Sequence, residues 1–222
     1  ALPNNDCSFT CTLFFPMTGK TSFETVRTEK EILDLFQSQF PDSIKLMPNL
    51  VEEFQNNPIG DLASVYCKPW HWEDKALLIG DAAHAVVPFF GQGMNASFQD
   101  CSTLAKLMGQ NENDWKTIFN AFSSVQVENG HAIADMALEN YMEMRDHVND
   151  PEYKKRREME LKLERMFPGQ FIPRYSMVSF HQIPYAEVYQ RGERQFNIIG
   201  DVLKADPSGQ SIDIAMVEKM LS

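Results

Sequence analysis

The sequence lacks several features that would assign it to a common functional class. Its four cysteines form no Cys-x-x-Cys pair, so neither a zinc site nor a dithiol redox motif is predicted, and reduced structural thiols are expected. No apolar run approaches the ~18 residues that a membrane-spanning helix requires, and no signal peptide is recognisable. There is also no Ser/His/Asp arrangement, metal-ligand spacing or carboxylate pair. We therefore predict no catalytic side chain and no metal site.

Positive charge is scarce as well. Lysine and arginine number 20 against 31 aspartates and glutamates, which gives a net charge of −11. A nucleic-acid-binding protein usually carries a basic face, and an anionic membrane surface attracts basic segments. The one basic run, Lys154–Arg157, has acidic residues at i+4 spacing, which is typical of a solvated helix face. Neither nucleic acid nor a membrane is expected as a partner.

What is present is an ordinary globular composition and one distinctive stretch. The 222 residues are 43% hydrophobic and 23% charged, enough for one large domain or parts of two. Residues 76–79 are apolar and predict a strand buried on both faces, followed by a Gly80-Asp81 turn. An aspartate directly after such a strand lies at the end of the sheet where α/β proteins bind ligands. A proline, two phenylalanines, a Gly-x-Gly loop and a helix come next.

The glycine loop is open to more than one interpretation. Gly91 to Ala96 matches the loose dinucleotide pattern G-x-G-x-x-[G/A], but the true fingerprint follows a strand directly and has an acid about 20 residues later. Here residues 88–90 intervene and Asp100 comes too early, so this is not a Rossmann phosphate loop. The residues alone leave both a cofactor site and an ordinary strand–turn–helix open.

Periodicity and capping signals predict the remaining elements. Thr28 and Glu31 form a capping box for a helix that runs to Pro41. The other expected elements are strands over 8–15 and 62–68, a short helix over 50–54, and helices from 95 to about 108 and over 115–127, 131–148, 152–167, 185–203 and 212–221. The helix after Asn95 is expected to bury one apolar face, made of Phe98, Cys101, Leu104, Ala105 and Met108.

Four segments resemble one enzyme family. Residues 80–100, GDAAHAVVPFFGQGMNASFQD, resemble the second flavin-contacting motif of the FAD-dependent aromatic hydroxylases, the p-hydroxybenzoate hydroxylase-like group. Residues 1–16, 137–145 and 171–180 are similar, in the same order, to the kynurenine-hydroxylating members of that family. The similarity weakens across 18–60 and after about residue 200. Four segments in register are far more specific than any single motif.

The resemblance implies a fold and a domain organisation. It implies an α+β portion of a p-hydroxybenzoate hydroxylase-like flavoprotein. Residues 1–70 would form part of an antiparallel substrate-domain sheet, residues 71–108 the returning strand and helix of the FAD-binding domain, and residues 109–222 a C-terminal helical domain. The strand–GxGxxG–helix unit of the family has no counterpart here. We therefore expect a carboxyl-terminal portion whose partner is the missing N-terminal Rossmann half.

The resemblance also implies a cofactor site. Asp81 would accept a hydrogen bond from a ribityl hydroxyl of FAD, and Pro88 would lie against the isoalloxazine. The backbone amides of Gly93, Met94 and Asn95 would face the pyrimidine carbonyl, where the positive end of a helix dipole suits the negative charge of reduced flavin. The implied cofactors are FAD and NADPH.

The implied substrate is L-kynurenine. Asn140 and Tyr175 match family positions that bind its carboxylate, and Gln92 lies close enough in the motif to assist. Considered singly, Asn140 is equally a helix-surface residue and Tyr175 a core aromatic. The expected apolar walls, with Leu2 and Phe14 meeting across the first hairpin, are Leu2, Phe14, Phe89, Phe90 and Met144.

The implied reaction is hydroxylation of L-kynurenine to 3-hydroxykynurenine with NADPH and O₂. It would proceed through a flavin C4a-hydroperoxide in a dry pocket, and this chain alone is not expected to be active. A cytoplasmic protein is expected because residues 206–210 are polar, or one at the mitochondrial outer membrane if the chain is a truncated eukaryotic member. The alternatives are a flavin hydroxylase of another aromatic substrate and a non-catalytic helical interaction module.

Overall fold

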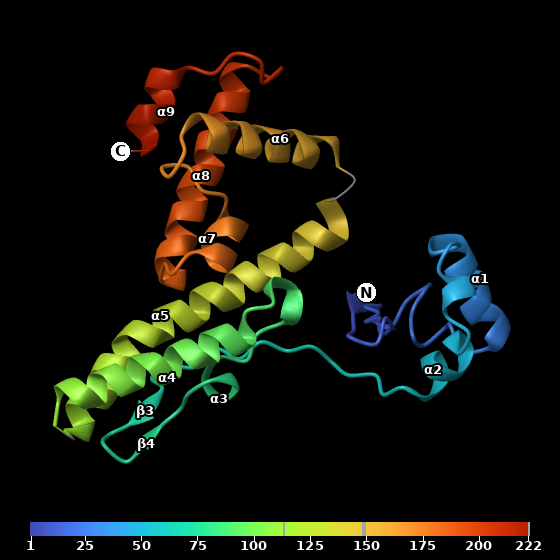
Figure 1. Ribbon diagram of the computed structural model, residues 1–222, viewed down its shortest axis with the longest axis horizontal. Helices are drawn as coiled ribbons and strands as arrows, with labels where there is room; N and C mark the ends of the chain where they lie inside the picture. Colours follow the sequence, from blue (N-terminus) through green and yellow to red (C-terminus); the bar gives the residue numbers. More distant parts are fainter. Residues whose placement is uncertain (113, 148–149, 222) are drawn as a thin grey trace. The chain divides into compact units, whose positions relative to one another are not determined.

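The computed structural model describes residues 1–112, 114–147 and 150–221 (Figure 1). The chain divides into two compact units, Ala1–Asp61 and Leu62–Ser222. The predicted division at residues 70 and 108 stays a prediction. Secondary structure is mostly helical, with two small antiparallel sheets of two strands each. None of the helices among the described residues is both long enough and apolar enough to cross a membrane.

The first unit contains a short hairpin and two helices. Its elements are β1 (Leu2–Pro3), β2 (Phe9–Thr10), α1 (Glu29–Gln39), the 3-10 turn η1 (Ile44–Leu46) and α2 (Leu50–Asn56). The predicted capping box is confirmed, because Thr28 and Glu31 each accept a hydrogen bond from the other's backbone N–H. Val26, Ile32, Phe36 and Leu50 form the core between the helices. The predicted helices of this unit are therefore present where local signals placed them.

The first hairpin differs from the prediction. Only Phe9–Thr10 of the expected strand 8–15 is paired, and Leu2 lies opposite Thr10. The turn sets this register, since the Asn4 N–H donates to the Ser8 carbonyl over 2.9 Å. Phe14 is thus four residues past the partner of Leu2, and the expected contact between Leu2 and Phe14 across the hairpin is wrong. Both side chains are exposed.

The sheet before the Gly80-Asp81 turn is also smaller than predicted. β3 (His71–Trp72) pairs with β4 (Ala76–Leu77), and the doubly buried strand expected over 76–79 is wrong because Ala76, Leu78 and Ile79 are exposed. The strand expected over 62–68 is wrong too. That segment donates one backbone hydrogen bond, from Val65 to Ala85, and has no strand partner among the described residues. Apolar alternation marks strand potential, but a strand needs a neighbour to pair with.

The second unit is built from helices. In chain order they are α3 (Asp81–His84), the 3-10 turn η2 (Pro88–Phe90), α4 (Gly93–Gln110), α5 (Trp115–Met142), the π-helical turn η3 (Glu143–His147), α6 (Pro151–Met166), α7 (Arg174–Phe180), α8 (Tyr185–Ala205) and α9 (Ile214–Leu221). The helices predicted over 152–167, 185–203 and 212–221 are confirmed to within two residues at each end. α7 was not predicted.

α5 replaces two predicted helices with one. It runs unbroken through Gly130, although a break was expected between residues 127 and 131. A Cβ on Gly130 would lie 2.6 Å from the fully buried ring of Trp70, so glycine is required here for packing. Burial of a tryptophan outweighs the ~1 kcal/mol by which glycine disfavours a helix. The predicted end of this helix at Val148 lies outside the described residues.

The inward face of α4 is the opposite of the one predicted. Ala96 and Asp100 are buried, whereas Phe98, Cys101, Ala105 and Met108 are exposed; Leu104 alone of the predicted face is half-buried. α4 and α5 form a helical hairpin (Figure 1). Ala96 of α4 packs in the same hydrophobic cluster as Ala132 and Ile133 of α5, so this side of α4 faces its partner.

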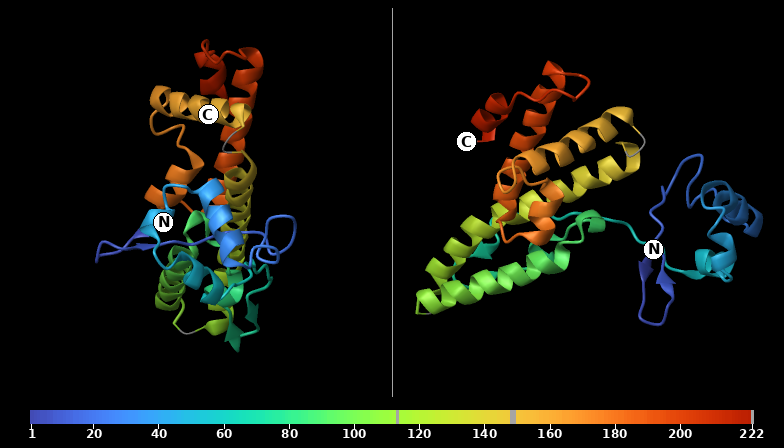
Figure 2. Two further views of the ribbon diagram at one scale, coloured as in Figure 1. Left: turned by 90° about the vertical axis from the view of Figure 1, so that its right-hand side faces the viewer. Right: turned by 45° about the horizontal axis from the view of Figure 1, so that its top comes forward.

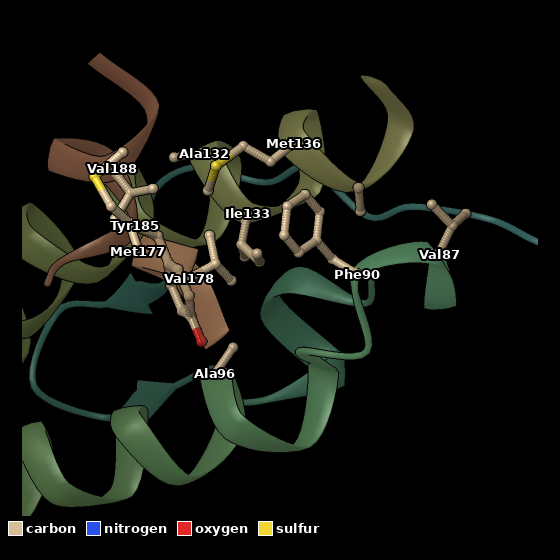
Figure 3. Packing of buried hydrophobic residues seen from close by; sticks show 11 residues of the cluster. Val87, Phe90, Ala96, Ala132, Ile133, Met136, Met177, Val178, Tyr185 and Val188 are labelled. Carbon is tan, nitrogen blue, oxygen red and sulfur yellow. The ribbon is translucent and has the colours of Figure 1, made fainter. Parts of the chain in front are cut away.

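Three hydrophobic clusters hold the second unit together. The largest joins η2, α4, α5, α7 and α8, and Figure 3 shows Phe90 beside Ile133 and Met136 of α5. A second surrounds Trp70, with Ala83, Phe122 and Val127. The third packs α6, α8 and α9 together at the C-terminal end of α8 (Figure 2). α8 therefore connects the turn at residues 88–90 to the last helices.

Candidate functional site

The Gly80-Asp81 turn lies against α4. Gly80 adopts φ +59°, a conformation that favours glycine, and a Cβ there would lie 3.2 Å from Ser97 Oγ on α4. Asp81 follows as the first residue of α3, with an exposed side chain. Its carboxylate makes no hydrogen bond or ion pair with any described residue. The turn thus presents a free acceptor beside the first turns of α4.

The loop between α3 and α4 is anchored by one phenylalanine and exposed at its proline. Phe90 is buried in the core, while Pro88 is exposed. Phe89 is half-buried, and its ring centroid lies 4.6 Å from that of Tyr141 on α5. Gly91, at φ +66°, then turns the chain into α4. Phe90 therefore anchors the loop in the core, and Pro88 remains accessible to solvent.

The N-terminus of α4 has no side-chain cap. The amides of Gly93, Met94 and Asn95 therefore have no partner within the helix, and the positive end of its dipole faces outward. The Asn95 side chain donates to Gln92 Oε1 over 3.0 Å instead. Tyr185 of α8 donates to the same oxygen over 3.1 Å, and Figure 3 shows its hydroxyl directed toward α4 near Ala96. Burial, then the charge of Asp100, raises the Tyr185 pKa, so this hydroxyl remains a donor.

The predicted substrate residues of the second unit converge on the same loop. Asn140 Nδ2 donates to the Phe89 carbonyl over 2.7 Å and contacts the sulfur of Met144 at 3.8 Å. The Tyr175 ring stacks on Phe90 with centroids 5.7 Å apart, and the Tyr175 side chain is 51% exposed. Asn140 thus contacts Phe89 and Tyr175 contacts Phe90, while Met144 lies beside Asn140. Leu2 and Phe14 belong to the first unit, and their role stays a prediction.

An ion-pair cluster positions two of these residues, and the sequence reasoning missed it. Arg174 of α7 donates to Glu139 of α5 and to Glu193 of α8, the latter over 2.7 Å. Tyr189 of α8 also donates to Glu139, over 3.0 Å. Because Glu139 precedes Asn140 and Arg174 precedes Tyr175, the cluster ties together the helices that carry both candidates. Nothing local in the sequence pairs residues 35 positions apart.

A buried polar cluster beneath the turn was also missed. Asp100 contacts His84 and Gln126, and all three side chains are buried. The signal was present in the sequence, since Asp100 follows Ala96 by one helical turn. A charged residue on an inward face needs buried partners.

The chemistry of this surface is binding rather than acid–base catalysis. A free carboxylate at Asp81 suits hydroxyl donors, and the uncapped amides of α4 suit the electron-rich edge of a planar ring. Among residues 1–112, 114–147 and 150–221, no group of three His, Cys, Asp or Glu side chains could hold a metal ion. These features fit a flavin, whose ribityl chain bears hydroxyls and whose pyrimidine edge becomes negative on reduction.

Comparison with known families gives one match, over the first half of the chain. Residues 13–117, which include the turn, the loop and α4, match the family described as FAD binding domain. Residues 80–100, which carry the resemblance to FAD-dependent hydroxylases, lie within this match.

The curated relatives of the chain are similar to it along nearly its whole length. The chain is 43% identical over 221 residues to the kynurenine 3-monooxygenase of Myxococcus xanthus, covering 100% of this chain and 47% of the relative. It is 43% identical over 206 residues to that of Flavobacterium johnsoniae, covering 93% and 46%. It is 38% identical over 235 residues to that of Dictyostelium discoideum, covering 100% and 51%. The chain is a homologue of these enzymes and spans about half their length.

Proposed function

We propose that the complete protein containing this chain is an FAD-dependent monooxygenase that converts L-kynurenine to 3-hydroxykynurenine with NADPH and O₂. The observation that carries the proposal is 43% identity to kynurenine 3-monooxygenases along the whole chain, through the residues that form the candidate site. The polypeptide supplying the other half of the FAD site is its partner.

The cofactor is assigned to the surface of the turn, the loop and α4. Asp81 accepts a ribityl hydroxyl, Pro88 abuts the ring system, and the amides of Gly93, Met94 and Asn95 bind the pyrimidine edge. The free carboxylate and the uncapped helix support these roles. When bound and reduced by NADPH, FAD supplies the activation of O₂ that no side chain of this chain can provide.

The substrate carboxylate is assigned to Asn140 and Tyr175. One amide hydrogen of Asn140 is committed to the Phe89 carbonyl, while the other meets only the weak acceptor sulfur of Met144. A carboxylate oxygen would replace that sulfur at little cost. The Tyr175 hydroxyl makes no hydrogen bond with a described residue and can donate as well. Gln92 assists through its amide nitrogen, because its oxygen is already occupied.

Exclusion of water is assigned to the apolar side chains around the loop. We assign Phe89, Phe90 and Met144 of the second unit to this wall; Leu2 and Phe14, which belong to the first unit, stay predicted wall residues. A closed apolar wall matters because water diverts activated oxygen to hydrogen peroxide.

The proposal is tested with the complete protein. NADPH oxidation is followed with and without L-kynurenine, and the product is identified by mass. We expect stimulation by L-kynurenine and a product one oxygen atom heavier. Oxidation that yields only hydrogen peroxide with every aromatic substrate would reject the hydroxylase, and a colourless protein unchanged by Asp81→Ala would favour a non-catalytic module.

Substrate identity is tested at the carboxylate site. Tyr175→Phe removes one charge-assisted hydrogen bond of about 1.5–3 kcal/mol, so KM for L-kynurenine should rise roughly tenfold or more with FAD affinity unchanged. Asn140→Leu should act in the same direction. Tyr66→Phe, which removes a tyrosine hydroxyl bonded to Asp135, is the matched control and should leave KM unaltered. Unaltered turnover of kynurenine in the first two variants would point to another aromatic substrate.

A further inference from the structure

Asp100 is the centre of a buried hydrogen-bond network beneath the Gly80-Asp81 turn. The residue is 1% exposed and accepts three hydrogen bonds. Oδ2 accepts from the Gly80 backbone N–H over 2.8 Å and from His84 Nε2 over 2.6 Å, and Oδ1 accepts from Gln126 Nε2 over 2.8 Å. These donors come from the turn, α3 and α5, and Asp100 itself lies on α4.

Packing holds His84 beside Asp100. The His84 ring stacks on Trp70 with centroids 4.9 Å apart, and its Nδ1 is buried with no partner among the described residues. The Gly80 amide and the Gln126 side-chain amide donate to Asp100, one to each oxygen, and His84 Nε2 shares a hydrogen bond with Oδ2.

The network continues to α8. Asn129 Nδ2 donates to Gln126 Oε1 over 3.0 Å, and Asn129 Oδ1 accepts from the Ala186 amide over 3.0 Å. Gln126 is thereby fixed in orientation, since its oxygen is held by Asn129 and its nitrogen can only face Asp100. His84 and Gln126 thus hold the Asp100 side chain in addition to its hydrogen bond with the turn.

The hydrogen bond from Gly80 to Asp100 bears directly on the cofactor site, because Gly80 precedes Asp81. Gly80 has φ +59° and ψ −146°, a backbone state that few residues favour. Among the residues that the structure describes, its N–H has no backbone acceptor and donates to Asp100 alone. Filling the interface between α4 and α5 would not require a charge, because an apolar side chain avoids the cost of burying one. The carboxylate instead supplies a directional hydrogen bond to the Gly80 amide.

We propose that Asp100 is a positioning residue for the cofactor, acting through Gly80 to orient the Asp81 carboxylate. His84 and Gln126 hold the Asp100 side chain, and Asp100 touches neither cofactor nor substrate. The proposal rests on the FAD site proposed above.

The test is a double-substitution cycle on FAD affinity in the complete protein. FAD is removed, and its dissociation constant is measured by flavin fluorescence for wild type, Asp100→Asn, Asp81→Ala and the double variant. In Asp100→Asn one carboxylate oxygen becomes an NH₂ group. Because this group donates and the amides around it also donate, the hydrogen bond to the Gly80 N–H is weakened. We expect each single change to weaken binding about tenfold and the double variant to be within about twofold of Asp81→Ala.

A matched control separates positioning from general stability. Ser123→Ala removes a buried hydrogen bond of 3.1 Å to the Trp70 amide in the same helical layer, without touching Asp100 or Gly80. The thermal midpoint of the FAD-free protein should fall in both Ser123→Ala and Asp100→Asn. FAD affinity should fall only in the latter.

Two further outcomes would overturn the proposal. Multiplicative losses of affinity in the double variant would mean that Asp100 does not act through Asp81. Rapid hydrogen exchange of the Gly80 amide in FAD-free wild type would mean that no hold exists, a measurement that stands even if Asp100→Asn does not fold. Failure of wild type to bind FAD would instead reject the proposed function together with this role.

Discussion

At the scale of residues, the site depends on polar side chains that hold one another rather than on reactive groups. Tyr185 fixes Gln92 from α8, and Arg174 fixes Glu139 from α7. A partner far away in sequence thus holds Gln92 itself in the first case and the residue next to Asn140 in the second. Such pre-organisation reduces the entropy that a ligand must overcome on binding.

The Tyr189–Glu139 bond predicts a dependence of stability on alkaline pH. This bond, then burial and the charges of Glu139, Glu193 and Asp135, raise the Tyr189 pKa from 10.0 to about 12. The folded protein therefore holds this proton more tightly than the unfolded chain. The stabilisation is fully present below pH 10 and is lost as the pH rises from 10 to about 12.

The measurement is the thermal midpoint of the complete protein at pH 8 and pH 11. Tyr189→Phe cannot ionise at this position, so its midpoint should fall less between the two pH values than that of wild type. Tyr66 and Tyr185, whose pKa values are also raised, are present in both proteins and cancel in the comparison. Identical falls would contradict the assignment.

At the scale of elements, the hairpin of α4 and α5 decides where the turn lies. α5 carries Gly130 where Trp70 packs and Gln126 where Asp100 is held, so one helix supports both the tryptophan and the network. The following π turn then carries Met144 to the side chain of Asn140. Such π turns recur at functional sites because they shift side chains by about one residue.

Two glycine substitutions test this packing. In Gly130→Ala the added methyl group meets the buried Trp70 ring at 2.6 Å and His84 Cβ at 3.1 Å. We expect a loss of about 1–3 kcal/mol of stability, against less than ~1 kcal/mol gained in helix propensity. Gly109→Ala on α4, where no atom lies within 4 Å, should be neutral or slightly stabilising. The check is the thermal midpoint, and equal effects at both positions would contradict the packing argument.

At the scale of the whole molecule, α4 exposes the apolar stripe that the sequence assigns to a buried face. Phe98 is 63% exposed, and Cys101, Ala105 and Met108 continue the stripe. The chain spans about half the length of its relatives. We therefore expect the rest of the complete protein to cover this stripe.

A charge placed in the stripe tests that expectation. If Phe98 is covered in the complete protein, Phe98→Asp should cost several kcal/mol, since a charge is then buried without a partner. If the stripe is in water, the cost should stay within about 0.5 kcal/mol. Lys106→Glu, on an exposed part of the same helix outside the stripe, is the control. Thermal unfolding of both variants distinguishes the two cases.

The sequence by itself determined what depends on neighbouring residues. The capping box at Thr28 is as predicted, and α6 and α8 begin at Pro151 and Tyr185, within one residue of the predicted starts. Each is fixed by bonds or backbone limits within a few positions. The Ala76–Asn95 stretch likewise indicated a flavin site, and it lies within residues 13–117, which match the family described as FAD binding domain.

Only the tertiary structure decided which partners meet. Periodicity finds an apolar stripe on α4 but not the helix that covers it, so the inward face was assigned to Phe98 instead of Asp100. Glycine propensity predicted a break at Gly130, and the bulk of Trp70 overrode it. The hold of Asp100 on Gly80, with Gln126 and Ala186 behind it, joins residues up to about a hundred positions apart. Hydrogen bonds and packing act over ångströms in space, and distance along the chain does not measure that separation.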